Sequence, residues 1–205
     1  MFKFIFMTAK GTISLLILLI LLAFGKVSAQ KTILLMSGNR IIPADLKVDS
    51  SGIILYKTFK GKVKSLEQDE VFSLTRADSV EVIFYKPGSE PEEFTVEEMR
   101  DYIIGMIDGK KKKVFFSFFG SFAVGFASGI FVPNYLAPIP VVGFSMGTGL
   151  IKVKDKNIIV PEKYNGNKHY IEGYKKGITK KRVTRSILGG SIGLITGIAV
   201  AAATK

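Results

Sequence analysis

The chain has 205 residues, of which 47% are hydrophobic, with a mean hydropathy of +0.30, a formal net charge of +12 and no cysteine. This length fits one or two domains. The lack of cysteine excludes disulfides, thiolate metal sites, cysteine nucleophiles and a lipid-modified N-terminal cysteine. Residues 30–109 carry a net charge of −4, whereas residues 110–185 carry +12. A basic band beside apolar segments favours anionic lipid headgroups over nucleic acid as its partner.

The first 29 residues have the pattern of a secretory signal peptide. Lys3 and Lys10 supply the charged start, residues 13–24 form an apolar core, and residues 27–29 read Val-Ser-Ala, a small-residue cleavage site. We expect cleavage after Ala29. The alternative is an uncleaved anchor helix, although the apolar core is short for a membrane span of about 20 residues.

Residues 30–86 are predicted to form a small antiparallel β-domain. Short β-branched and alternating segments at 32–36, 40–48, 53–58, 71–76 and 79–85 are separated by glycine-containing turns. Pro43 indicates an edge or a bulge in the second strand. Five or six such strands in about 55 residues are typical of an SH3-like or Sm-like barrel.

Residues 87–109 are predicted to form an acidic linker and then an amphipathic helix. Thr95 and Glu98 have the spacing of a capping box, and Gly109 is expected to follow the last turn. The apolar stripe of this helix covers the open side of the β-domain or lies on a membrane surface. Its members are Val96, Met99, Ile103, Met106 and Ile107.

Three apolar segments follow in residues 110–205, the predicted helical membrane domain. Residues 114–132 are 19 uncharged residues, which span about 28 Å as a helix, close to the hydrocarbon core of about 30 Å. Residues 136–151 are also uncharged but contain two prolines and three glycines, so they predict a second span or a re-entrant segment. Residues 186–203 form the last span.

Residues 102–132 and 170–200 are two copies of one pattern, aligned without gaps at an offset of 68 residues. Each copy has a Tyr/Gly start, a basic cluster and an apolar stretch with small residues at every fourth position. Identical pairs include Tyr102/Tyr170, Gly105/Gly173, Gly109/Gly177, Lys112/Lys180, Lys113/Lys181, Gly125/Gly193 and Gly129/Gly197.

Small residues spaced four apart lie on one helix face and let two backbones approach closely in a membrane. The predicted helix-packing residues are Ser121, Gly125, Gly129, Gly189, Gly193 and Gly197. The two grooves can pack against each other as a hairpin or a three-helix unit. Alternatively, the grooves of different chains pack together and form an oligomer or a pore. A further alternative is that the glycines have no packing role and are only compatible with a membrane environment.

The direct repeat also predicts two parallel spans, which require a return pass between them. All basic clusters and the β-domain then lie on one face of the membrane. The positive-inside rule places that face in the cytoplasm, whereas a cleaved signal peptide places it outside. We predict a periplasmic β-domain and leave inner or outer membrane open. The predicted headgroup contacts are Lys110, Lys111, Lys112, Lys113, Lys180, Lys181, Arg182 and Arg185.

The sequence offers no constellation for catalysis, cofactor binding or metal binding. His169 is the only histidine and is expected at a helix start. Glu97, Glu98 and Asp101 are expected on a solvated helix face. Residues 189–193 resemble a glycine-rich phosphate loop only superficially, because they lie inside an apolar segment rather than between a strand and a helix.

Two stretches resemble an uncharacterised family of small envelope membrane proteins from Gram-negative bacteria. One is ILLMSGNRIIPADL at 33–46 followed by GIILYK at 52–57, and the other is the pair YIIGMIDG at 102–109 and YIEGYKKG at 170–177. The resemblance implies a signal peptide, a small β-domain and a glycine-rich membrane tail, and no particular activity. The glycine spacing also resembles glycine-zipper envelope proteins, which usually carry a lipobox cysteine that this chain lacks.

These features together predict an α+β membrane protein of the cell envelope that is not an enzyme and has no cofactor. It has a small β-domain, an amphipathic helix and two to three glycine-rich transmembrane helices. Its predicted role is an anchored interaction or scaffold module, with lipids and a protein partner or a second copy as its contacts. The alternative is an oligomeric pore or transport component, and an anionic-polymer binder is a third reading.

Overall fold

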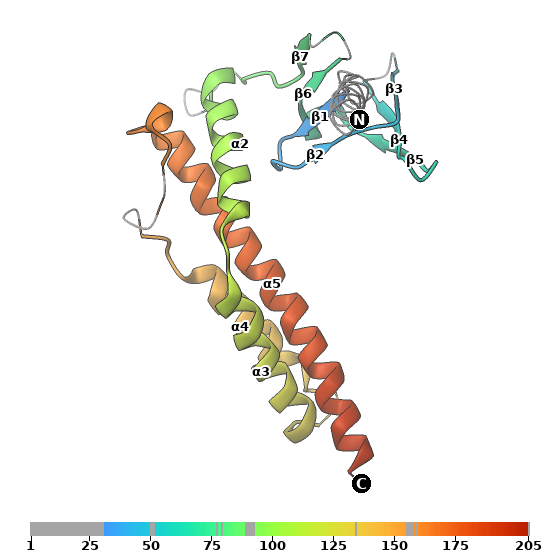
Figure 1. Ribbon diagram of the computed structural model, residues 1–205, viewed down its shortest axis with the longest axis vertical. Helices are drawn as coiled ribbons and strands as arrows, with labels where there is room; N and C mark the ends of the chain where they lie inside the picture. The colour runs from blue at the N-terminus through green and yellow to red at the C-terminus, as the bar shows by residue number, and fades with distance from the viewer. Residues whose placement is uncertain are drawn as a thin grey trace, which may run out of the picture.

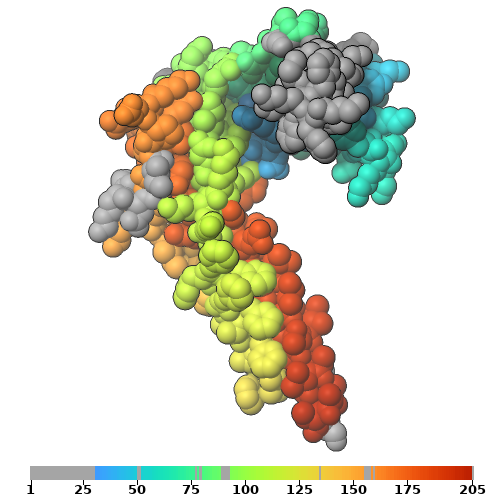
Figure 2. Space-filling view, in the orientation of Figure 1, coloured from blue at the N-terminus to red at the C-terminus, as the bar shows by residue number. Residues whose placement is uncertain are grey.

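The computed structural model describes residues 31–49, 52–76, 78, 80–88, 93–133, 135–154, 158 and 160–204. The predicted signal peptide, 1–29, lies outside the described residues. The protein is α+β: in the described residues, two small antiparallel sheets precede a group of helices, as the sequence predicts. Residues 115–133, 135–150 and 186–203 extend away from the β-domain as a narrow helical unit, which we call the stalk and which ends near the C-terminus (Figures 1 and 2).

Within the part of the chain that the structure describes, seven short strands form the two sheets. A four-stranded sheet has the order β2-β1-β6-β7, and a three-stranded sheet has the order β3-β4-β5. Every strand pairing is antiparallel. The strands are β1 Thr32–Leu35, β2 Arg40–Ile41, β3 Asp45–Val48, β4 Ile54–Lys57, β5 Val63–Leu66, β6 Val71–Thr75 and β7 Glu81–Ile83, with a 3-10 turn, η1, at Gln68–Glu70.

Both sheets contribute side chains to one small core. Ile33 from β1 and Val71 from β6 are fully buried beside Ile54 from β4. Strand β4 alternates between buried and exposed residues, because successive side chains of a strand point to opposite faces. The remaining buried members of this core are Tyr56 and Leu74.

The predicted second strand, 40–48, is in fact two strands in different sheets. β2 pairs with β1, whereas β3 pairs with β4, and Pro43 lies in the break between them. Proline has no N–H to give to a ladder, which suits it to this crossing point. Strand β5 was not expected as a strand, although the turn before it was. Gly61 has φ +78° there, a left-handed conformation that favours glycine.

Four helices of the described residues follow: α2 Val96–Lys111, α3 Phe115–Phe131, α4 Pro138–Leu150 and α5 Lys168–Ala203, with a 3-10 turn, η3, at Glu162–Tyr164. The capping box at the start of α2 forms as predicted, because the Thr95 hydroxyl accepts from the Glu98 N–H while the Glu98 carboxylate accepts from the Thr95 N–H. The sequence predicts that this helix ends before Gly109. That prediction is wrong, because the helix continues to Lys111. A 58° bend then separates α2 from α3.

Helix α2 joins the β-domain to the rest of the helices. Arg100 forms a 2.8 Å ion pair with Glu81 at the start of β7. At the other end of the helix, the Lys110 ammonium donates to the Ser37 carbonyl oxygen at 2.8 Å in the β1–β2 turn. Met106 contacts Gly38 in the same turn. Part of the predicted apolar stripe therefore faces the β-domain.

Candidate functional site

Helix α5 packs along both α2 and α3 through glycines that touch the opposite backbone. A β-carbon at Gly173 would overlap the carbonyl group of Tyr102, and a β-carbon at Gly105 would overlap that of Tyr170. Residues 102 and 170, like 105 and 173, are equivalent positions of the repeat. The glycine of α5 therefore meets the tyrosine carbonyl of α2, and the equivalent glycine of α2 meets the equivalent carbonyl of α5. Two helices related by a two-fold axis make contacts in this reciprocal way.

The same reciprocity extends into α3. Gly125 faces the Gly190 carbonyl, while Gly193 faces the carbonyl of Phe122. At the next turn, a β-carbon at Gly129 would lie 2.6 Å from the Leu194 oxygen, and Gly197 faces Phe126. Residues 190 and 194 are 68 positions after 122 and 126. The positions in contact increase together along both helices, so α3 and α5 run parallel.

All six residues predicted to pack helices are buried in this interface. Ser121, Gly125 and Gly129 lie on α3, and Gly189, Gly193 and Gly197 lie on α5. Gly109, expected after the last turn of α2, is a further member, because it faces the carbonyl of Tyr174. Such close approach brings the two backbones into dispersion contact and leaves no room for larger side chains.

Helix α4 runs antiparallel to this pair and covers one side of it. Its residues meet those of α5 in reverse order, since Val141 contacts Gly190 and Gly149 contacts Val183. Between these contacts, the Ser145 hydroxyl donates to the Ser186 hydroxyl at 3.2 Å. At the turn before α4, Ser128 donates to the Ala137 carbonyl at 2.6 Å. These two buried hydroxyls thus have partners in neighbouring segments, whereas the buried Ser121 hydroxyl has none among the described residues.

An aromatic and acidic cluster fastens the N-terminal half of α5 to α2. The Tyr170 ring stacks on Tyr164 with centroids 4.5 Å apart, and its hydroxyl donates to Asp108 at 3.1 Å. Burial and the negative charge of Asp108 raise the pKa of Tyr170 far above its usual range. The phenol is therefore held protonated as a structural hydrogen-bond donor.

His169 lies in the first turn of α5, at the helix start where the sequence places it. Its Nε2 lies 3.2 Å from a carboxylate oxygen of Glu98, and its ring packs edge-on against Phe94. Nearby, the Asn167 side chain caps α5 and donates to Asp101 at 2.6 Å. Within the described residues no group of three or more histidine, cysteine or acidic side chains is placed to hold a metal ion.

Some of the residues predicted to contact headgroups are bound to other groups of the protein, and others form no ion pair with a described residue. Lys110 binds the β1–β2 turn, and burial together with the nearby charge of Lys180 lowers its pKa. Lys111 pairs with Asp108 at 2.7 Å, and Arg182 donates to the Ile151 carbonyl at 2.9 Å. Among the described residues no ion pair involves the others, which are Lys112, Lys113, Lys180, Lys181 and Arg185.

Three basic segments, 112–113, 152–154 and 181–185, meet at the break between α2 and α3, and we call them together the basic collar. A pocket of about 300 Å³ gathers cations from all three segments. They come from the end of α2, from the segment after α4 and from α5. The cations are Lys112, Lys113, Lys152, Lys154 and Arg182.

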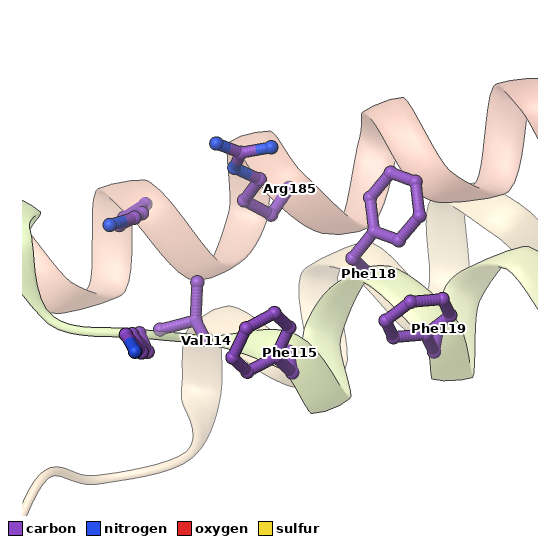
Figure 3. A pocket seen from close by; sticks show the side chains of 7 residues that line it. Val114, Phe115, Phe118, Phe119 and Arg185 are labelled. Atoms are coloured by element: carbon purple, nitrogen blue, oxygen red, sulfur yellow. The ribbon is translucent and has the colours of Figure 1, made fainter.

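A second pocket of the basic collar, which we call the phenylalanine pocket, has about 320 Å³. It lies between the start of α3 and the middle of α5, and Figure 3 shows Arg185 on α5 across from Val114 and the phenylalanines of α3. No lining side chain is acidic. No sequence pattern predicts this pocket. It combines four apolar side chains with three cations: Val114, Phe115, Phe118, Phe119, Lys113, Lys181 and Arg185.

One helix of the described residues, α5, is long and apolar enough to cross a membrane, with a mean hydropathy of 1.8 over its best window. A second span exists by the same measure only if α2 and α3 count as one bent helix. Beyond the basic collar, the stalk exposes many large apolar side chains. They include Phe116, Phe131, Ile139, Met146, Leu150 and Ile195.

The repeat therefore builds a close-packed parallel helix pair with an apolar outer surface and a basic collar at one end. This arrangement can hold a membrane-embedded segment and attract anions at its collar. Comparison of the chain with protein-family models, with curated proteins and with solved structures finds no match.

Proposed function

We propose that this protein is a non-enzymatic membrane protein of the cell envelope that anchors an interaction or scaffold domain. The observation that carries the proposal is the stalk, where a glycine-packed core is surrounded by exposed apolar side chains. A soluble protein rarely exposes a continuous apolar surface of this kind, because leaving it in water is costly. A bilayer removes that cost.

In this proposal α3 and α5 cross the membrane in parallel, and α4, which follows α3 in the chain, returns along one side of the pair. Helix α3 rises about 25 Å and α4 about 20 Å, so both are shorter than the hydrocarbon core of about 30 Å, and α4 is the shorter of the two. The basic collar then lies at the anionic headgroups. The stalk carries no charged residue within α3, α4 or 186–203 to line a conducting pathway.

The β-domain lies on the same side of the membrane as the basic collar, outside the cytoplasm. A fluorescent protein that matures only in the cytoplasm, inserted after Lys86, tests this orientation. We expect no fluorescence there, whereas the same reporter fused to a cytoplasmic control protein fluoresces. Fluorescence of the fusion at Lys86 would overturn the orientation and would place the basic collar in the cytoplasm.

The partner of the β-domain is a protein or a second copy of this chain. The glycine grooves of α3 and α5 fill each other, so self-association would use another surface. Gly143 and Gly147 on α4 have no neighbouring atom near a β-carbon position and supply the open small-residue face. The mass of the detergent-solubilised protein separates these cases: a ring-sized oligomer would favour the pore alternative, and a monomer would exclude it.

A further inference from the structure

The phenylalanine pocket occupies a groove whose symmetry mate is already filled by part of the chain. On one side of the α3–α5 pair, α4 packs against Val183 and Ser186 of α5. The repeat equivalents of these two residues, 68 positions earlier, are Phe115 and Phe118, which line the phenylalanine pocket. An apolar rod, α4, thus fills one groove, and the equivalent groove on the other side is open.

The end of the open groove that lies in the basic collar is cationic. Lys113 and Lys181 are repeat equivalents, and they face the groove from its two sides together with Arg185. No ion pair in the described part of the chain engages any of the three. The first turn of α3 also opens here, and its N-cap, Val114, has no side-chain hydrogen bond to offer the free N–H groups.

We propose that the phenylalanine pocket binds one anionic phospholipid. Lys113, Lys181 and Arg185 take the phosphate, and the first part of an acyl chain lies along Phe115, Phe118 and Phe119. The proposal rests on the membrane function above, because the lipid reaches this groove from a bilayer at the level of the basic collar.

Two features favour a lipid over a soluble phosphate compound. The wall of the groove is aromatic, and Phe115 and Phe119 are 66% and 62% exposed, so the groove is open to the apolar surface of the stalk. A polar ligand would leave this surface uncovered. The neighbouring pocket of the basic collar has more cations but no aromatic wall, so it attracts headgroups without holding an acyl chain.

The chain contains no tryptophan, so Phe119→Trp supplies a single fluorescent reporter in the groove. The full-length protein is placed in phosphatidylcholine vesicles with a minor fraction of phosphatidylglycerol. Quenching is compared when only one of the two lipids is brominated. The test variant adds Lys181→Gln and Arg185→Gln, and the matched control adds Lys152→Gln and Lys154→Gln, which remove the same charge from the other pocket. A further arm adds inorganic phosphate.

We expect brominated phosphatidylglycerol to quench well beyond its share of the bilayer. The preference should fall about 25-fold in the test variant, since each basic residue near the surface contributes a factor of about five. It should persist in the control and with inorganic phosphate. Equal loss in both variants would show a diffuse charge effect and overturn the site. Displacement by inorganic phosphate would overturn the lipid assignment.

The same measurement separates failure of the site from failure of the membrane proposal. Quenching in proportion to bilayer composition, with no preference, shows an inserted stalk and refutes the lipid site alone. No quenching by either brominated lipid shows a reporter outside the bilayer and refutes both. The single variant Arg185→Gln, at an exposed position, keeps the comparison decisive if the double variant inserts poorly.

Discussion

Gly173 lies directly against the backbone carbonyl of Tyr102, so that any β-carbon at residue 173 would overlap it. Both residues belong to the repeat, and the equivalent pair, Gly105 and Tyr170, makes the same contact in the opposite direction. The pattern recurs down to Gly197 and Phe126. A sequence repeat is therefore expressed in three dimensions as a two-fold relation between packed helices.

Replacing Gly193 with leucine should strongly destabilise the stalk. Its β-carbon would overlap the Phe122 carbonyl, which belongs to the backbone and cannot rotate away. We expect a loss of about 3 kcal/mol, at the upper end of the usual cost of overpacking. The measurement is the unfolding midpoint in mixed detergent micelles, supported by resistance to protease.

Gly143→Leu is the matched control, because a β-carbon there meets no atom within 4 Å. Leucine also has the higher helix propensity, so the free energy of unfolding should stay the same or rise by up to about 1 kcal/mol. Similar losses in the two variants would show that detergent contact or self-association through α4, rather than the α3–α5 interface, determines stability.

Ser121→Ala should stabilise the protein. The Ser121 hydroxyl is buried and has no hydrogen-bond partner among the described residues, so the wild type leaves a polar group unsatisfied. Removing it should raise the free energy of unfolding by about 1 kcal/mol. Ser145→Ala should do the reverse, because that hydroxyl bonds to Val141 and Ser186. Loss of stability in both variants would mean that Ser121 has a partner.

Acid should loosen the contact between α2 and the β-domain. Burial raises the pKa of Glu81, but hydrogen bonds from Ser73 and Arg100 and the charge of Arg100 outweigh it, so the pKa lies below 4.5. The contribution of this carboxylate is complete above about pH 4.5 and is lost as the pH falls through the lowered value. Both side chains are partly exposed, so we expect only about 0.5–1 kcal/mol.

Hydrogen exchange at the start of α2 measures this effect as a function of pH. Glu81→Gln should show faster exchange at neutral pH and little further change in acid. If the wild type and Glu81→Gln respond to acid identically, other carboxylates are responsible.

Alkali should weaken the junction of α5 with α2 through Tyr170. Because burial and Asp108 raise its pKa above the ordinary value of 10.0, the phenol stays protonated in the folded protein after it ionises in the unfolded chain. Its contribution is complete below about pH 10 and is lost at higher pH. Thermal unfolding should show this loss, and Tyr170→Phe should remove it while costing about 1 kcal/mol at neutral pH. A phenylalanine variant with the wild-type alkaline profile would refute the assignment.

Features encoded within a few residues could be predicted from the sequence. The Thr95–Glu98 capping box and the turns at Gly38, Gly52 and Gly61 depend on local chemistry, and each forms where expected. The repeat also predicts the parallel arrangement of α3 and α5, because equivalent grooves of small residues favour packing of equivalent faces.

Features decided by distant contacts could not be predicted. Gly109 matches a helix C-terminus locally, but its contact with Tyr174 keeps it inside α2. Strand β5 has mostly exposed residues and forms because β4 offers a free edge. The phenylalanine pocket lies beside the bend between α2 and α3, which the continuous helix at the equivalent residues of α5 does not share.

The two-fold relation means that this chain holds both partners of a helix dimer in one polypeptide. Association of separate helices depends on their concentration in the membrane, whereas covalent linkage makes the local concentration high and constant. One copy of α4 per pair also leaves the two sides of that dimer unequal. A single chain thereby presents one open groove even when the protein is scarce.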